Sequence, residues 1–230
     1  MEEELPRVTP ALLRRADDMC RRRIAKEHAG GKRFANRASD ARFAVANRVV
    51  ADARLAHAEL GPPRTEAFVD PTDLEPEQRA LYRAAVAGYL ATFGAEPGRA
   101  ADLGWRTVIE EQGVELLSDA GLAVELPDGR RELRQLRLSG NPVTLEPTDV
   151  FVALIRTRDW APDDLRIVAV DLLSLESAEH IPDLGRERAE AFAWITERIE
   201  LVKSRALDGR AQAGADCSGC AFIAGCDRHT

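Results

Sequence analysis

The cysteines are the residues of this sequence whose type and spacing point most clearly to chemistry. Three of the four lie close together, as Cys217, Cys220 and Cys226 in a C-x2-C-x5-C pattern, and the fourth is the distant Cys20. Four thiolates are the ligand set of an iron–sulfur cubane or of a structural zinc ion. We therefore expect a metal site that ties both ends of the chain together and closes a very long loop.

Other uses of these thiols fit the sequence less well. Disulfides form in oxidising compartments, and the acidic residues 1–6 contain none of the apolar core of a signal peptide. A redox pair at Cys217 and Cys220 would be expected to open a helix after a strand, whereas this pair follows the loop-like segment 208–216. Four unrelated thiols would rarely cluster in this way. Metal ligation is favoured, and ligand type alone leaves iron–sulfur and zinc both open.

Composition excludes some classes of protein. The chain has 230 residues, 45% of them hydrophobic, so it can bury a core, and its apolar runs are far too short to cross a membrane. We therefore expect a cytoplasmic protein with no membrane partner. The net charge of −7 argues against an evenly basic surface, but residues 1–54 are rich in arginine, while 66–77 and 176–183 are acidic. The basic region suits either phosphate contacts or an ordinary solvated helix surface.

Helices are expected in the N-terminal part, residues 1–100. Thr9 and Pro10 are typical of a helix start, and apolar residues at helical spacing continue to residue 26, which places Cys20 on this helix with its sulfur turned inward. A second helix is expected over 34–60 and a third over 77–93. In the second helix, the residues expected to face inward are Phe43, Ala46, Val49, Val50, Ala53 and Ala56.

Short strands are expected next, within residues 101–205. The strand-like runs are 106–111, 114–117, 122–126, 133–138, 149–156 and 165–173, and the last of them should be central. Pro127, Asp128 and Gly129 predict a hairpin turn. A long helix over 184–205 should face inward through Ala189, Phe192, Ile195, Ile199 and Val202, before a cysteine knuckle at 206–230. Helices, a mixed sheet, a helix and a metal knuckle predict one α+β (mixed α/β) domain over 1–230.

This layout resembles the RecB-like branch of the PD-(D/E)XK nuclease superfamily, in particular its iron–sulfur members, the AddB-type repair nucleases and the nucleases of CRISPR adaptation. The likeness is carried by segment 9–23, where a Thr-Pro start precedes Cys20 and three arginines, and by the cysteine pattern of segment 216–226. The resemblance implies a restriction-endonuclease-like mixed sheet flanked by helices. It also implies a [4Fe–4S] cluster held by Cys20, Cys217, Cys220 and Cys226.

The active site of such a nuclease needs carboxylates that hold Mg²⁺ or Mn²⁺, and a lysine that positions water or stabilises charge. In the family an Asp ends one strand of a hairpin, and an Asp/Glu-x-Lys motif lies on the next strand. By position, Gly121, Gln135 and Arg137 fall where the first Asp, the second acid and the lysine should be. Arg137 cannot replace a proton-labile lysine, because a guanidinium stays charged. The resemblance therefore implies a degenerate nuclease site.

Other acids would hold a metal only if the ligands have moved. Asp119 and Glu132 are the fallback candidates, and Glu110, Glu111 and Glu125 lie nearby in the sequence. Solvated hairpin charges are the simpler interpretation, since no set shows the required spacing. Asp171 is expected to cap or end a strand. The upstream histidine of the family has Asn47 as its nearest counterpart and His57 as a more distant one.

The sequence contains no phosphate-binding loop, dinucleotide fingerprint or nucleophile elbow. Trp105, Trp160 and Trp194 suit packing better than base stacking. The leading hypothesis is an iron–sulfur protein of RecB-like nuclease fold that does not cleave DNA, and that binds DNA or scaffolds a repair or defence complex. The alternative is an active Mg- or Mn-dependent DNA exonuclease with relocated carboxylates. A third hypothesis is a metal protein unrelated to DNA.

Overall fold

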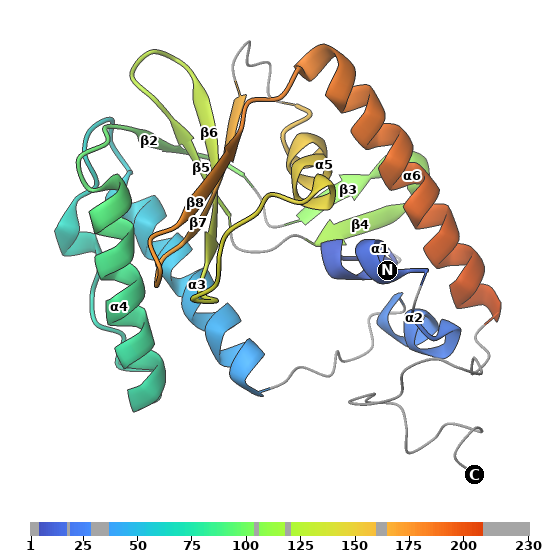
Figure 1. Cartoon of the computed structure of the whole chain (residues 1–230), viewed down its shortest axis with the longest axis horizontal. Coiled ribbons are helices and arrows are strands. Elements are labelled where there is room, and N and C mark those ends of the chain that lie inside the picture. Colours follow the sequence, from blue (N-terminus) through green and yellow to red (C-terminus); the bar gives the residue numbers. More distant parts are fainter. Residues whose placement is uncertain are drawn as a thin grey trace. The chain divides into compact units, whose positions relative to one another are not determined.

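In the computed structural model the chain divides into two compact units. The structure describes residues 5–17, 19–28, 37–103, 106–117, 121–159 and 165–208. The first unit takes its described residues from 1–35, 106–118 and 189–230, and the second takes them from 36–105 and 119–188. Figure 1 shows the elements of each unit. Within the part of the chain that is described, no helix is long and apolar enough to cross a membrane.

The second unit is built on a five-stranded mixed sheet in the order β2-β5-β6-β7-β8. β6 and β7 run parallel, and the other neighbours are antiparallel. β7, predicted to be central, has a strand on each side and is an inner strand, although β6 is the middle strand of the five. The strands are β2 Arg99–Ala101, β5 Gly121–Glu125, β6 Arg131–Arg137, β7 Leu165–Asp171 and β8 Ser177–His180.

The predicted hairpin joins β5 to β6. Leu126 N donates to Arg130 O over 2.8 Å, and Gly129 N donates back to Leu126 O over 3.0 Å. Gly129 has a φ of 85°, a left-handed conformation that glycine adopts without steric cost. This turn sets the strand register, in which Gly121 lies opposite Gln135.

Helices cover both faces of this sheet. Figure 1 shows α3 (Arg37–Ala56) and α4 (Pro76–Phe93) on one side, and α5 (Pro147–Arg156) on the other. A short 3-10 helix, η1 (Thr65–Ala67), lies between α3 and α4 in the sequence. The core between α3, α4 and the sheet contains Val45, Val49, Ala53, Tyr82, Ala85, Tyr89, Phe93, Leu122, Val124, Leu136, Val168 and Val170.

Two details of α3 differ from the prediction. The helix ends at Ala56, before Gly61, since the backbone turns there and Arg64 N donates to Ala56 O over 3.0 Å. The prediction that Phe43 faces inward is wrong, because 49% of this residue is exposed, whereas its predicted partners Ala46, Val49, Val50, Ala53 and Ala56 are buried.

The prediction of a strand over 149–156 is also wrong, because these residues form α5. Pro147 occupies the first turn, where its missing N–H costs nothing, and Asp149 Oδ2 accepts from Glu146 N over 3.2 Å as part of a capping box. Six apolar residues in a row, 150–155, suit a buried helix as well as a buried strand. The capping residues at 146–149 were the signal that distinguished the two.

The first unit contains a separate three-stranded sheet in the order β1-β4-β3, so the strands form two sheets and not the single sheet expected. Its strands are β1 Arg7–Val8, β3 Arg106–Ile109 and β4 Val114–Leu117. A 3-10 helix, η2 (Glu110–Gln112), ends the predicted strand 106–111 early. The helices are α1 Pro10–Arg15, α2 Arg21–His28 and α6 Leu184–Asp208, most of which belongs to this unit. The coarse α+β class is confirmed.

The first helix starts as predicted but is interrupted. Thr9 Oγ1 accepts from Leu12 N over 3.2 Å, which confirms the N-cap, and Pro10 is the first helical residue. The single helix expected over 11–26 is instead two helices, with Cys20 between them. The prediction that Cys20 lies on a helix is therefore wrong. In α6, Ile195, Ile199 and Val202 are buried as expected, but Ala189 and Phe192 are exposed.

Candidate functional site

The β5–β6 pair brings together the three residues that stand where the resemblance implies nuclease ligands. Gly121, the first residue of β5, is the register partner of Gln135 on β6, and Arg137 lies two residues further along β6. Because side chains alternate along a strand, Gln135 and Arg137 project from the same face. This is the face that α5 covers. The three residues carry no carboxylate between them.

Gln135 and Arg137 both reach the start of α5. Arg137 Nη2 lies 2.9 Å from Asp149 Oδ2, and Arg137 Nη1 donates to Thr144 O over 3.0 Å. Gln135 Nε2 contacts Asp149 O at 3.4 Å. Asp149 is thus held by the guanidinium and by the first turn of α5. Any anion that binds Arg137 from solution has to compete with this ion pair.

The other end of α5 reaches Gly121. A Cβ atom at Gly121 would lie 3.1 Å from Arg156 Nη1 and 3.5 Å from Leu133 Cδ1. Arg156 is the last residue of α5 and is only 8% exposed. The space where a side chain of residue 121 would project is therefore already bordered by a guanidinium.

Asp171 ends β7 and is fully buried. Its Oδ2 accepts from Ser139 N, Ser139 Oγ and Gly140 N at 2.6, 2.6 and 2.9 Å. Its Oδ1 accepts from Leu173 N and Ser174 N at 3.0 and 3.1 Å. Although burial acts to raise the pKa of Asp171, these hydrogen bonds, led by the Ser139 hydroxyl, lower it. The prediction that Asp171 caps and ends a strand is confirmed.

Of the two fallback acids, Glu132 does not form a metal site with these residues. Glu132 lies on the face of β6 opposite to Gln135 and is ion-paired there, whereas Asp119 lies outside the described residues. Glu125 pairs with Arg99 at 2.8 Å, and Glu110 and Glu111 belong to the first unit. In the described part of the chain, no group of three or more His, Cys, Asp or Glu residues could hold a metal ion.

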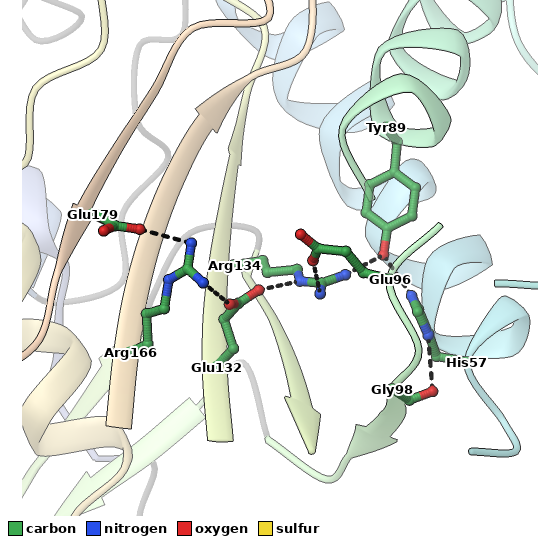
Figure 2. A network of polar contacts seen from close by, with 8 residues as sticks. All are labelled: His57, Tyr89, Glu96, Gly98, Glu132, Arg134, Arg166 and Glu179. Carbon is green, nitrogen blue, oxygen red and sulfur yellow. Dashed lines mark hydrogen bonds and ion pairs between the residues drawn. The ribbon is translucent and has the colours of Figure 1, made fainter. Parts of the chain in front are cut away.

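A buried polar network lies on the other face of the same sheet, and Figure 2 shows its eight residues. Its centre is Arg134, a fully buried arginine whose Nε lies 2.6 Å from Glu132 Oε1 and whose Nη2 lies 2.9 Å from Glu96 Oε2. The guanidinium also stacks 3.9 Å from the ring centroid of Phe93. On the β8 side, Arg166 bridges Glu132 and Glu179 at 3.5 and 2.7 Å.

The network continues from Arg134 to the helices as a directional hydrogen-bond chain. Arg134 Nη1 donates to Tyr89 Oη over 3.3 Å, Tyr89 Oη lies 3.0 Å from His57 Nε2, and His57 Nδ1 lies 3.1 Å from Gly98 O. A carbonyl oxygen can only accept, so Nδ1 carries the hydrogen and Nε2 accepts from the tyrosine hydroxyl. This arrangement requires neutral His57.

Burial shifts the pKa values of His57 and Tyr89 in the directions that this hydrogen-bond chain requires. It lowers the pKa of His57, against the hydrogen bond to Gly98, and the positive charge of Arg134 lowers it further. Burial also raises the pKa of Tyr89, so the hydroxyl keeps its hydrogen. His57 is therefore a structural junction of α3, α4 and the segment before β2. Asn47, the nearer counterpart of the family histidine, is exposed on α3.

Sequence reasoning missed Arg156, Asp149 and this network. Glu132 and Arg134 alternate with apolar residues on a strand, and opposite charges two residues apart on a strand share one face. That spacing was a signal for a paired face, but the hairpin charges looked solvated because their partners are distant in sequence.

The cysteine site is described only at Cys20, because Cys217, Cys220 and Cys226 lie outside the described residues. Cys20 is half-buried and directly precedes α2, where its carbonyl oxygen accepts from Ile24 N over 3.0 Å. The adjacent Arg21 forms an ion pair with Asp208, the last residue of α6. The start of α2 and the end of α6 therefore meet.

Two arginines of α6 bind the segment between α1 and α2. Arg198 Nε donates to Leu13 O over 2.9 Å and its Nη1 lies 2.5 Å from Asp17 Oδ2, while Arg205 Nη1 donates to Asp17 O over 2.6 Å. His28 Nδ1 lies 3.2 Å from Arg7 O, and burial lowers its pKa. The segment that carries Cys20 is thus held in place by the protein itself.

Comparison with known proteins does not assign the chain to a family. No family model matches it, and no similar sequence is found among curated proteins.

Proposed function

We propose that this chain is an iron–sulfur protein of RecB-like nuclease fold that does not cleave DNA, and that it binds DNA or scaffolds a repair or defence complex. One observation carries the catalytic part of this proposal. At the β5–β6 pair, Gly121 and Gln135 lie opposite each other without a carboxylate, the guanidinium groups of Arg137 and Arg156 lie nearby, and the carboxylate of Asp149 is already paired with Arg137. A divalent ion needs anionic oxygens, so this arrangement favours binding without metal-dependent cleavage.

The arrangement of the first unit supports the cluster. Arg21, next to Cys20, pairs with Asp208, which precedes Cys217 by nine residues. Nine residues can span up to roughly 30 Å when extended, so the cysteine pattern is within reach of Cys20. The half-buried position of Cys20 beside a helix start also suits a thiolate ligand. Cys20, Cys217, Cys220 and Cys226 would hold the metal, which supplies a cross-link between the chain ends.

The hypothesis of an active exonuclease with relocated ligands loses one of its two fallback acids. Both oxygens of Glu132 are engaged by Arg134 and Arg166, and the residue is only 1% exposed. Displacing two guanidinium groups to bind a metal would leave buried charges without partners, which is costly. Asp119, outside the described residues, is the remaining candidate for that hypothesis.

The cluster is tested by spectroscopy and metal analysis of protein purified without oxygen. We expect a brown protein with broad absorption near the blue edge of the visible and about four irons per chain. Cys20→Ser should lose most of the iron, whereas the matched control Arg21→Gln, which removes only the neighbouring ion pair, should keep it. A colourless protein that contains one zinc per chain would show that the four cysteines hold zinc and not an iron–sulfur cluster. Full metal content in Cys20→Ser would exclude Cys20 as a ligand.

The catalytic part is tested with single- and double-stranded DNA in Mg²⁺ and in Mn²⁺. We expect no cleavage, and we expect binding that weakens steeply with salt if phosphates are the contacts. Arg137→Ala should weaken binding, whereas Arg130→Ala, in the exposed hairpin turn, should leave it nearly unchanged. Cleavage with Mn²⁺ that disappears in Asp119→Ala would establish an active nuclease with relocated ligands instead.

A further inference from the structure

Arg156 occupies a distinctive position at the β5–β6 pair. Its Nη1 lies 3.1 Å from the point where a Cβ of residue 121 would stand, which is closer than most side chains approach one another. A side chain at residue 121 would therefore require the guanidinium to shift. Glycine at this position leaves room for Arg156, which is 8% exposed.

We propose that Arg156 is a built-in cation that fills the place of a divalent metal at this pair, and that Gly121 is the residue that makes room for it. This inference rests on the proposed function, because it takes Gly121 and Gln135 as the counterparts of metal ligands. It adds that the site is closed to metal by a positive side chain and not only by missing carboxylates.

Electrostatics support this role for Arg156. A fixed guanidinium within a few ångströms repels a divalent cation, and the repulsion is strong where water is largely excluded. Two described carboxylates in this region, those of Asp149 and Asp171, already have partners. Asp149 is paired with Arg137, and Asp171 accepts five hydrogen bonds from the backbone and from Ser139.

The register of the hairpin makes the inference testable. Residues directly opposite each other in an antiparallel pair have Cβ atoms about 4.5–5.5 Å apart, so two carboxylates at 121 and 135 can share one cation. The double variant Gly121→Asp/Gln135→Glu should bind Mn²⁺ only weakly, because the new carboxylate at residue 121 would pair with Arg156. Adding Arg156→Leu should strengthen Mn²⁺ binding at least tenfold, measured by calorimetry and by the Mn²⁺ electron paramagnetic resonance signal.

Two outcomes of this titration would overturn the proposal. One is equal Mn²⁺ affinity with and without Arg156. The other is a folded triple variant that binds no Mn²⁺, because Arg156 would then not be what closes the site. The uncharged control is Gly121→Asn with Gln135 left unchanged, made both with Arg156 and with Arg156→Leu. It measures any Mn²⁺ that binds elsewhere on the chain.

A thermodynamic cycle keeps the test independent of metal binding and of any variant that folds poorly. Gly121→Asp should be more stable than Gly121→Asn when Arg156 is present, and less stable than Gly121→Asn when Arg156 is replaced by leucine. If the difference in stability between the Asp and Asn variants is the same with and without Arg156, then Arg156 does not interact with residue 121. Cleavage of DNA by the unmodified protein would instead contradict the proposed function, and neither result can be mistaken for the other.

Discussion

Tyr89 and His57 are joined by a buried hydrogen bond of 3.0 Å that can run in only one direction, from the tyrosine hydroxyl to Nε2 of the imidazole. The direction is imposed from the far side of the ring, where Gly98 O must accept from Nδ1. If His57 were protonated, both Arg134 and His57 would donate to Tyr89 Oη, and the hydroxyl hydrogen of Tyr89 would lose its acceptor. Protonation would also place a second positive charge near Arg134. The contact between the helices and the sheet in the second unit therefore depends on neutral His57.

Because of His57, the stability of the folded protein should decrease as the pH is lowered. Its pKa is lowered in the folded state, so the unfolded chain binds more protons between that lowered value and the ordinary value of about 6.5. The free energy of unfolding should thus be highest above pH 6.5 and decrease as the pH falls below it. Urea unfolding between pH 8 and pH 5 measures this, and His57→Gln should flatten the dependence.

His28 is the necessary control for that measurement, because burial lowers its pKa as well. His28→Asn should remove its own contribution and leave that of His57. If His57→Gln keeps the full dependence that remains in the His28→Asn background, the hydrogen-bond direction assigned to Tyr89 is wrong.

Arg134→Met should destabilise the second unit by about 3–5 kcal/mol. The change leaves Glu132 buried with Arg166 as its remaining ion-pair partner, and a buried charge that loses its partner is costly. Adding Glu132→Leu should recover much of that loss, since an apolar pair replaces a buried ionic one. Chemical unfolding of both variants tests this, with Arg99→Met in the exposed pair with Glu125 as the control that should change little.

Asp171→Asn should destabilise the second unit by about 3 kcal/mol, because an amide cannot accept all five hydrogen bonds that the carboxylate accepts. The lowered pKa of Asp171 means that its contribution is present above pH 4 and is lost as the pH falls toward the folded-state value. The difference in unfolding free energy between wild type and variant should therefore shrink below pH 4. A difference that stays constant down to pH 2 would contradict this account.

Gly88→Ala should destabilise the second unit by at least about 3 kcal/mol, although alanine favours helices over glycine by about 1 kcal/mol. A Cβ at Gly88 in α4 would lie 1.9 Å from Leu172 O, a backbone atom that cannot move aside easily. Gly61→Ala is the matched control, because its Cβ would meet no atom within 4 Å. Thermal unfolding of the two variants should differ clearly, and similar melting temperatures would mean that α4 does not approach β7 so closely.

Local sequence signals predicted the elements whose determinants are themselves local. Thr9 and Pro10 start α1 because a capping oxygen and a fixed φ act within one turn. Gly129 closes the β5–β6 hairpin through its own positive φ, and that turn sets Gly121 opposite Gln135. The four cysteines, read as a metal-ligand set, are likewise a matter of residue type and spacing, and that interpretation remains a prediction.

Tertiary structure decided the features that depend on partners distant in sequence. The capping residues at 146–149 mark the run 149–156 as a helix, but only the packing of α5 against the sheet brings Asp149 to Arg137 and Arg156 to Gly121. The same is true of Glu132 and Arg134, which are charged hairpin residues by sequence and a buried network by position. Burial and pairing are set by the whole fold, because the energy of a charge depends on which groups surround it and on whether water can reach it.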